Sequence, residues 1–287
     1  RPILSDRVSI PLQRKLLVAV TAATRLPFLS QGVKRSAIAL NGVPAQKLTP
    51  RVVADEGASI LFLHGGAYCV GSPTTHRNLS SHLATAAQCV VYSLDYRMGP
   101  ECPFPAAVDD AEAAWQALLA DGLAPQKIAI AGDSAGGGLA LATTLRLRDQ
   151  GQPLPGALFL ISPSTDMTQS GETISSKQAV DPLISVGWIR QCTQAYAGGE
   201  DLKQPLLSPL FAECAGLPPI RIDVGSDEIL LSDAQRFTAR AQGAGVEVDL
   251  HVHEGLWHDF QLFAGMMSAA TRTLNESGAW LRNKLAG

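Results

Sequence analysis

One serine between a buried strand and a helix constrains this chain more than any other feature. The motif Gly-Asp-Ser-Ala-Gly, centred on Ser134, follows the apolar stretch 127–131 and precedes the apolar stretch 138–142. So sharp a turn strains the serine backbone and exposes its hydroxyl, and glycines two residues away on either side avoid side-chain collisions. The bare motif also occurs in ordinary strand-to-helix turns, but with this strand and helix around it the motif predicts a nucleophile elbow.

A serine hydroxyl is a weak nucleophile near neutral pH, so it needs a general base and a carboxylate that orients the base. The stretch 219–225 predicts a further strand, and Asp227 follows its end. The alternating stretch 246–253 predicts a half-exposed strand, and the loop after it carries His258. The order Ser134, Asp227, His258 is expected of an α/β-hydrolase and not of chymotrypsin-like or subtilisin-like proteases.

Donors for a developing oxyanion are also present. The apolar stretch 58–63 predicts a strand that leads into His64 and a Gly-Gly pair. Glycines there let backbone N–H groups approach a substrate closely, and each such donor typically contributes about 2.7–4 kcal/mol to lowering the barrier. The N–H of Ala135, directly after the serine, would complete an oxyanion hole.

Taken together, these motifs and the stretches 95–97 and 100–110 resemble the bacterial hormone-sensitive-lipase family of carboxylesterases. The similarity runs from about Ser59 to the C-terminus. The resemblance implies the α/β-hydrolase fold with a small helical cap, and a serine esterase that acts on short-chain acyl esters through an acyl-enzyme intermediate. It assigns these roles: nucleophile Ser134, acid Asp227, base His258, and an oxyanion hole at Gly65, Gly66, Ala67 and Ala135.

Two positions depart from the family pattern. Many relatives have glycine where Ala67 stands, and the alanine methyl would narrow the acyl site slightly. Relatives commonly have proline where Glu228 stands, which here leaves two carboxylates, Asp227 and Glu228, side by side. We expect Asp227 to orient His258, because it aligns with the acid of the family.

Other polar residues near these motifs have simpler interpretations. Asp133 is adjacent to the serine and is expected to face elsewhere in such a turn. His64 is expected to hold the oxyanion loop in shape, and His76 to be structural or solvated. Asp259 directly follows His258, which makes it a poor candidate for orienting that imidazole.

Strands alternating with helices predict an α/β class protein with a mostly parallel, eight-stranded sheet flanked by helices. Two segments, about 1–32 and 164–203, fall outside this alternation and are expected to form the cap. With 287 residues, of which 46% are hydrophobic, the chain is expected to form a single domain over 1–287. The expected strands are 36–40, 46–53, 60–63, 89–94, 128–131, 158–161, 220–224 and 248–252.

Charge and cysteine content narrow the function classes. A net charge of −3 provides no basic stripe for nucleic acid or an anionic membrane, and no apolar run reaches the roughly 18 residues of a membrane span. The five cysteines are scattered without metal-ligand spacing, so we expect no metal and no cofactor, and a reducing, cytoplasmic location. The stretch 15–24 is interpreted as a cap helix rather than a signal peptide. The expected partner is a small ester substrate, and the sequence leaves open whether the chain forms a homodimer.

Two alternatives share these motifs. The same machinery could open a lactone, and the cap would decide between a cyclic and a linear ester. Plant gibberellin receptors resemble this family but lack the catalytic histidine and bind without turnover. Because His258 is present, a non-catalytic binder is disfavoured.

Overall fold

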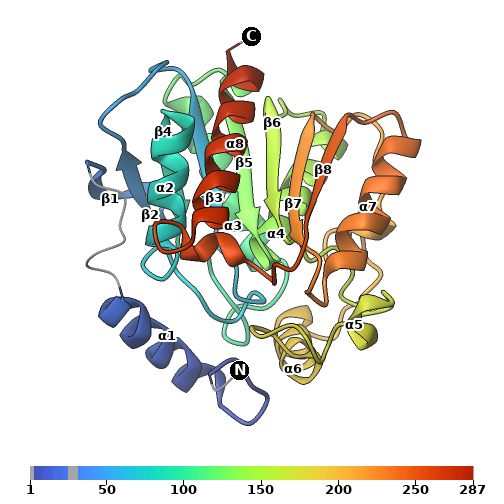
Figure 1. The fold of residues 1–287 in the computed structure, drawn as a ribbon. Coiled ribbons are helices and arrows are strands. Elements are labelled where there is room, and N and C mark those ends of the chain that lie inside the picture. The colour runs from blue at the N-terminus through green and yellow to red at the C-terminus, as the bar shows by residue number, and fades with distance from the viewer. Residues whose placement is uncertain (1–2, 25–31, 287) are drawn as a thin grey trace.

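The computed structural model describes residues 3–24 and 32–286. Within them, eight strands form one sheet in the order β1-β2-β4-β3-β5-β6-β7-β8 (Figure 1). β1 pairs antiparallel with β2, and β2 with β4, while the remaining pairs are parallel. The α/β class and the mostly parallel eight-stranded sheet are therefore confirmed. The strands are β1 (Lys34–Leu40), β2 (Val43–Thr49), β3 (Ser59–Leu63), β4 (Val90–Leu94), β5 (Ile128–Asp133), β6 (Ala157–Ile161), β7 (Ile220–Gly225) and β8 (Val248–His253).

The central strands are buried along their whole length. All residues of β3, β5, β6 and β7 are buried. Burial on both faces explains why β3, β5 and β6 are near-continuous apolar runs in the sequence, whereas β7 also contains Arg221 and Asp223, which pair with each other at 3.0 Å. The edge strand β8 is only partly buried, and its residues alternate in type as expected of a half-exposed strand.

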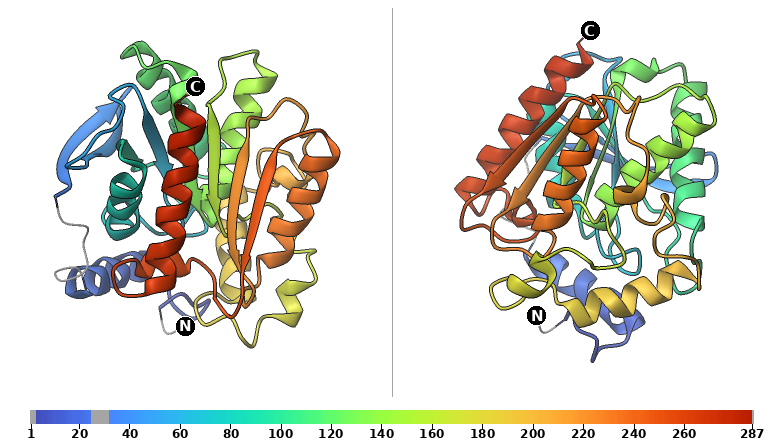
Figure 2. Two further views of the ribbon diagram at one scale, coloured as in Figure 1. Left: turned by 45° about the horizontal axis from the view of Figure 1, so that its top comes forward. Right: turned by 90° about the vertical axis from the view of Figure 1, so that its right-hand side faces the viewer.

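Helices cover both faces of the sheet (Figure 2). On one face, α2 (Arg77–Ala87) packs against α8 (Ser268–Leu285) over a core that includes Phe62 and Phe159. The other face carries α3 (Ala106–Ala120), α4 (Ala135–Asp149) and α7 (Leu231–Gly243). Because helices cover both faces of the sheet, polar side chains of the central strands can reach solvent or a substrate only at the ends of these strands.

Three helices lie beyond the carboxyl ends of the strands, namely α1 (Ile10–Thr24), α5 (Thr173–Ser176) and α6 (Val186–Ala197) (Figure 1). The indole Nε1 of Trp188 on α6 donates to Gln13 Oε1 on α1 at 2.7 Å, so the two expected cap segments contact one another. Arg14 of α1 donates to the carbonyl oxygens of Cys69 and Gly99 at 2.7 Å. Residues 1–2 and 25–31 of the expected cap lie outside the described residues.

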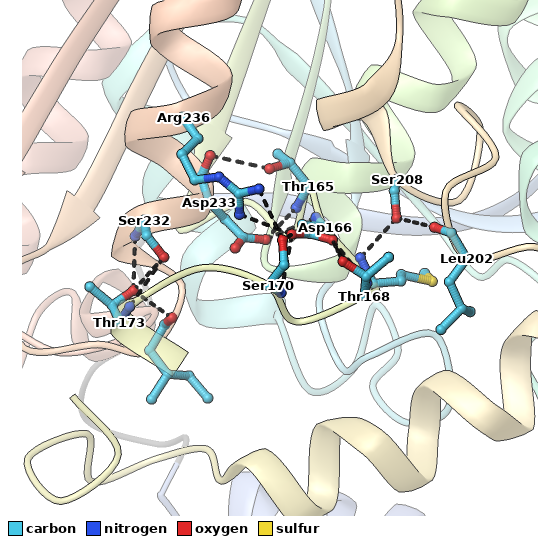
Figure 3. A network of polar contacts seen from close by, with 12 residues as sticks. Thr165, Asp166, Thr168, Ser170, Thr173, Leu202, Ser208, Ser232, Asp233 and Arg236 are labelled. Carbon is cyan, nitrogen blue, oxygen red and sulfur yellow. Dashed lines mark hydrogen bonds and ion pairs between the residues drawn. The ribbon is translucent and has the colours of Figure 1, made fainter. Parts of the chain in front are cut away.

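A buried polar network fixes the start of the second expected cap segment to α7 (Figure 3). One carboxylate oxygen of Asp233 accepts the backbone N–H groups of Thr165 and Asp166, each at 2.9 Å. Asp166 in turn accepts from Arg236 at 2.9 Å and from Ser170 at 2.6 Å. Burial raises the pKa of Asp233 to about 7, although the two backbone hydrogen bonds act in the opposite direction.

Candidate active site

Ser134 occupies a strained turn at the carboxyl end of β5. Its backbone has φ 54° and ψ −119°, an arrangement that non-glycine residues rarely adopt and that concentrates at functional sites. The backbone N–H of Ser134 donates to Ile161 O at 2.8 Å, and α4 begins at the next residue. A Cβ on Gly136 would collide with the carbonyl oxygen of Leu63, so this close approach requires glycine. The strand, turn and helix expected around Ser134 are all present.

The fit at this glycine gives a stability prediction. Gly136→Ala should lower the free energy of unfolding by about 1–3 kcal/mol or more, because the new methyl must displace buried backbone. Gly243→Ala is the matched control, since a Cβ there meets nothing within 4 Å, and this change should raise stability by about 0.4–1 kcal/mol. Urea denaturation measures both. Equal midpoints for the two variants would contradict the tight packing described for the turn.

His258 lies between the serine and a carboxylate. Its Nε2 is 3.0 Å from Ser134 Oγ, and its Nδ1 is 3.0 Å from Glu228 Oε1. Both His258 and Glu228 are buried, with exposed fractions of 1% and 0%. The second oxygen of Glu228 accepts from Ser162 Oγ at 2.7 Å and from the Gly225 N–H at 2.8 Å. Hydrogen bonds to both oxygens thus fix this carboxylate against the imidazole.

The expected acid, Asp227, lies elsewhere. Its carboxylate is 3.2 Å from Lys177 Nζ, and its side chain is 39% exposed. In the turn after β7, the backbone N–H of Asp227 donates to Leu256 O, and the next side chain is the one directed inward. The expectation for Asp227 is therefore corrected: the structure places the neighbouring Glu228, and not Asp227, against His258.

The loop after β3, which is expected to supply oxyanion donors, has an unusual backbone. Gly66, Ala67 and Tyr68 all have positive φ, at 122°, 51° and 59°. The Gly66 carbonyl accepts the N–H groups of Cys69 and Val70, at 3.0 and 2.9 Å, which closes the turn. Glycine is required at position 66 because a Cβ would also collide with the carbonyl of Val70.

The side chains of Tyr96 and His64 stabilise this loop. Tyr96 Oη donates to His64 O at 2.6 Å, and the two rings stack at 4.3 Å. Burial lowers the pKa of His64 to about 3, so its ring is neutral and Nδ1–H can donate to Gly65 O at 2.8 Å. The structural role expected of His64 agrees with these contacts.

Two cavities meet at Ser134. Ala67 and Ala135 line the smaller one, which has a volume of about 20 Å³, and Gly66 and His258 line the larger one, of about 140 Å³. Ile184 and Trp188 contribute to both, so the segment that contains α6 forms a common roof. Gly65 packs against Asp133 and belongs to neither set of lining residues. Of the expected oxyanion residues, Gly66, Ala67 and Ala135 thus surround the serine.

Two site residues were not expected from the sequence. Trp188 roofs both cavities, and only its position in an apolar stretch within the expected cap pointed to it. Asp259, which its place next to the histidine made a poor candidate for orienting the ring, has Oδ2 3.1 Å from His258 Nε2, on the serine side of the ring. Asp133 faces away from the nucleophile, as expected, and lies 3.1 Å from His76 Nε2.

The described part of the chain contains neither a metal-binding cluster nor a membrane-spanning helix. Across residues 3–24 and 32–286, no group of three or more His, Cys, Asp or Glu side chains is arranged to hold a metal ion. In the same part of the chain, no helix combines the length and apolar composition needed to cross a bilayer.

Known proteins resemble this chain in sequence. The sequence model of the α/β-hydrolase fold family matches residues 60–262. An "Acetyl-hydrolase" of Streptomyces hygroscopicus is 40% identical over 81% of this chain and 78% of its own length. An "Esterase" of Acinetobacter venetianus is 38% identical over 83% of this chain and 78% of its own length.

A solved structure extends the match to nearly the whole chain. The crystal structure of an esterase from the bacterial hormone-sensitive lipase family superposes with a TM-score of 0.93 and 38% identity, covering 97% of this chain and 92% of that one. Sequence family, fold and curated relatives agree with one another. This chain therefore belongs to the α/β-hydrolase fold family, among the bacterial hormone-sensitive lipase esterases, and is a carboxylic-ester hydrolase.

Proposed function

We propose that the chain hydrolyses short-chain acyl esters through an acyl-enzyme intermediate on Ser134, with His258 as general base and Glu228 as the carboxylate that orients it. One observation carries the proposal: His258 contacts Ser134 through Nε2 and Glu228 through Nδ1, each at 3.0 Å. This is the relation between nucleophile, base and orienting acid that serine hydrolysis requires.

Each group has a defined step. As Ser134 Oγ attacks the ester carbonyl carbon, its proton passes to His258 Nε2, while the Nδ1–H donated to Glu228 fixes the imidazole tautomer. The backbone N–H groups of Gly66, Ala67 and Ala135 stabilise the oxyanion of the tetrahedral intermediate. The imidazolium then protonates the leaving alcohol, and a water molecule activated by the same base hydrolyses the acyl-enzyme.

The two cavities suggest how an ester is oriented. His258 must deliver its proton to the leaving oxygen, so the alcohol belongs in the larger cavity, which His258 lines. The acyl group then occupies the smaller cavity, which at about 20 Å³ offers much less room than the cavity of about 140 Å³ on the alcohol side. A two-carbon acyl group fits this space best, in keeping with the acetyl-hydrolase name of one relative. In this proposal, α1 and α6 act as the cap that encloses the substrate.

An acyl-chain series tests the proposal. With aryl esters of increasing acyl length, kcat/KM should peak at about two to four carbons. Each methylene buried against an apolar wall contributes roughly 0.8 kcal/mol of binding free energy, and methylenes beyond the end of the cavity contribute nothing. Met167→Ala, in the smaller cavity, should move the peak to longer chains. Leu262→Ala, in the larger cavity, is the matched control and should leave the peak in place. Activity that rises steadily to sixteen-carbon esters would contradict the proposal.

A further inference from the structure

Asp259 and Ser134 compete for the same nitrogen of His258. Asp259 Oδ2 is 3.1 Å from Nε2, and Ser134 Oγ is 3.0 Å from the same atom. The left-handed backbone of Asp259, with φ 51° and ψ 34°, places its carboxyl beside the ring of the preceding residue. The residue is 5% exposed, so this contact is sheltered from water.

The contact has a chemical consequence for the base. A neutral imidazole that donates Nδ1–H to Glu228 presents a lone pair at Nε2, and that lone pair must accept the serine proton. An ionised Asp259 and an unprotonated Nε2 are both acceptors, so no hydrogen bond can form between them. The pair of Asp259 and His258 is therefore favoured when it holds one proton between Oδ2 and Nε2, and in that state Nε2 cannot accept the proton of Ser134.

We propose that Asp259 controls when His258 can act as a base: it retains a proton on Nε2 in the free enzyme, and catalysis begins only after that proton has passed to solvent water. This inference rests on the proposed roles of Ser134 and His258. Asp259 takes no part in bond making, and its effect is on the protonation of the base.

The charged surroundings favour retention of the proton. Glu228 faces the other side of the imidazole, and the ion pair of Asp133 and His76 lies nearby at the ends of β5 and before α2. His64, at the end of β3, is neutral. Three carboxylates thus face two ionisable imidazoles, so deprotonating His258 leaves a buried excess of negative charge.

The pKa shifts of His258 and Asp259 also favour retention of the proton. Burial by itself lowers the pKa of His258, but the charges and hydrogen bonds of Asp259 and Glu228 outweigh it and raise this pKa well above its ordinary value. Burial raises the pKa of Asp259 to about 7, and the nearby charge of Asp133 acts in the same direction. Because His258 must be neutral to accept a proton, its raised pKa moves the acid limb of the pH profile of kcat/KM above the ordinary imidazole value of about 6.5.

Two variants at position 259 test the inference. Asn and Gly both tolerate positive φ, so Asp259→Asn and Asp259→Gly keep the backbone while removing the charge. In both variants, the acid limb of kcat/KM for an aryl acetate should move at least about one unit to lower pH, because loss of the opposite charge lowers the pKa of His258. Asp249→Asn is the matched control, because this carboxylate is 43% exposed and contacts His251. The acid limb of kcat/KM of this variant should not move.

A readout without turnover separates this inference from the proposed function. The His258 imidazole titration followed by NMR in a Ser134→Ala background should show the same downward shift when Asp259 is replaced by Gly. An unchanged limb and an unchanged imidazole pKa in a folded 259 variant would overturn the role of Asp259. High esterase activity of Ser134→Ala would instead overturn the proposed function and leave the titration result standing. If the Asn variant does not fold, the Gly variant decides.

Discussion

Ser134→Ala should lower kcat for a short aryl ester by about five to six orders of magnitude, the loss found when the nucleophile of a serine hydrolase is removed. Alanine has no oxygen to attack the carbonyl, so only the oxyanion donors and substrate binding remain, and these alone leave about 10³–10⁴-fold over water. Initial rates at saturating substrate measure the loss.

The matched control is Ser176→Ala on α5, an exposed serine within the expected cap segment 164–203. Its kcat should equal that of the unaltered chain, and thermal unfolding should show both variants folded. A Ser134→Ala rate within about tenfold of the unaltered chain would mean that another residue attacks the ester, because loss of the nucleophile costs far more.

The second large effect is expected at Glu228. Glu228→Gln keeps the length of the side chain but presents an amide that can donate to His258 Nδ1, which stabilises the tautomer with its proton on Nε2. That tautomer cannot take the serine proton, and loss of the orienting carboxylate lowers kcat by about 10⁴ in a comparable site.

The adjacent carboxylate supplies the control for this change. Asp227→Asn makes the same chemical substitution one residue away, on a side chain that is 39% exposed and paired with Lys177. Its effect on kcat should be no more than a few-fold, since exposed ion pairs contribute about 0–1 kcal/mol. If Asp227→Asn proved the more damaging of the two, the orienting role of Glu228 would be wrong.

Much of the fold could be predicted because its signals are local. The fully buried strands β3, β5 and β6 are apolar runs, and their alternation with helices predicts a parallel sheet. The setting of Ser134 was predictable for the same reason, since strand, turn and helix lie within a few residues of one another. His258 could be predicted because it follows an alternating strand in the expected chain order.

The choice between Asp227 and Glu228 could not be made from sequence. The two residues are adjacent, and the inward side chain of Glu228 contacts Ser162, which is 66 residues away in the chain, and His258, which is 30 residues away. Family alignment pointed to Asp227, but an alignment places residues along the chain and does not show where a side chain points. The contact of Asp259 with Nε2 was missed for a related reason, because it depends on a left-handed backbone at that residue.

The cap was predictable as a region but not in its contacts. Its segments stood out because they broke the alternation of strands and helices. The roof over Ser134 depends on Trp188, whose indole is held by Gln13 across 175 positions of the sequence. A contact of that separation leaves no local pattern, so the sizes of the two cavities could be obtained only from the folded chain.

The most direct test of the central claim is covalent labelling of the nucleophile. Intact-mass analysis after treatment with an organophosphate should show one adduct per chain, and peptide mapping should place it on Ser134, because the 3.0 Å contact with His258 activates this hydroxyl. The Ser134→Ala variant should remain unlabelled under the same conditions. An adduct that persists in that variant, or one that maps to another residue of the unaltered chain, would contradict the assignment of Ser134 as the nucleophile.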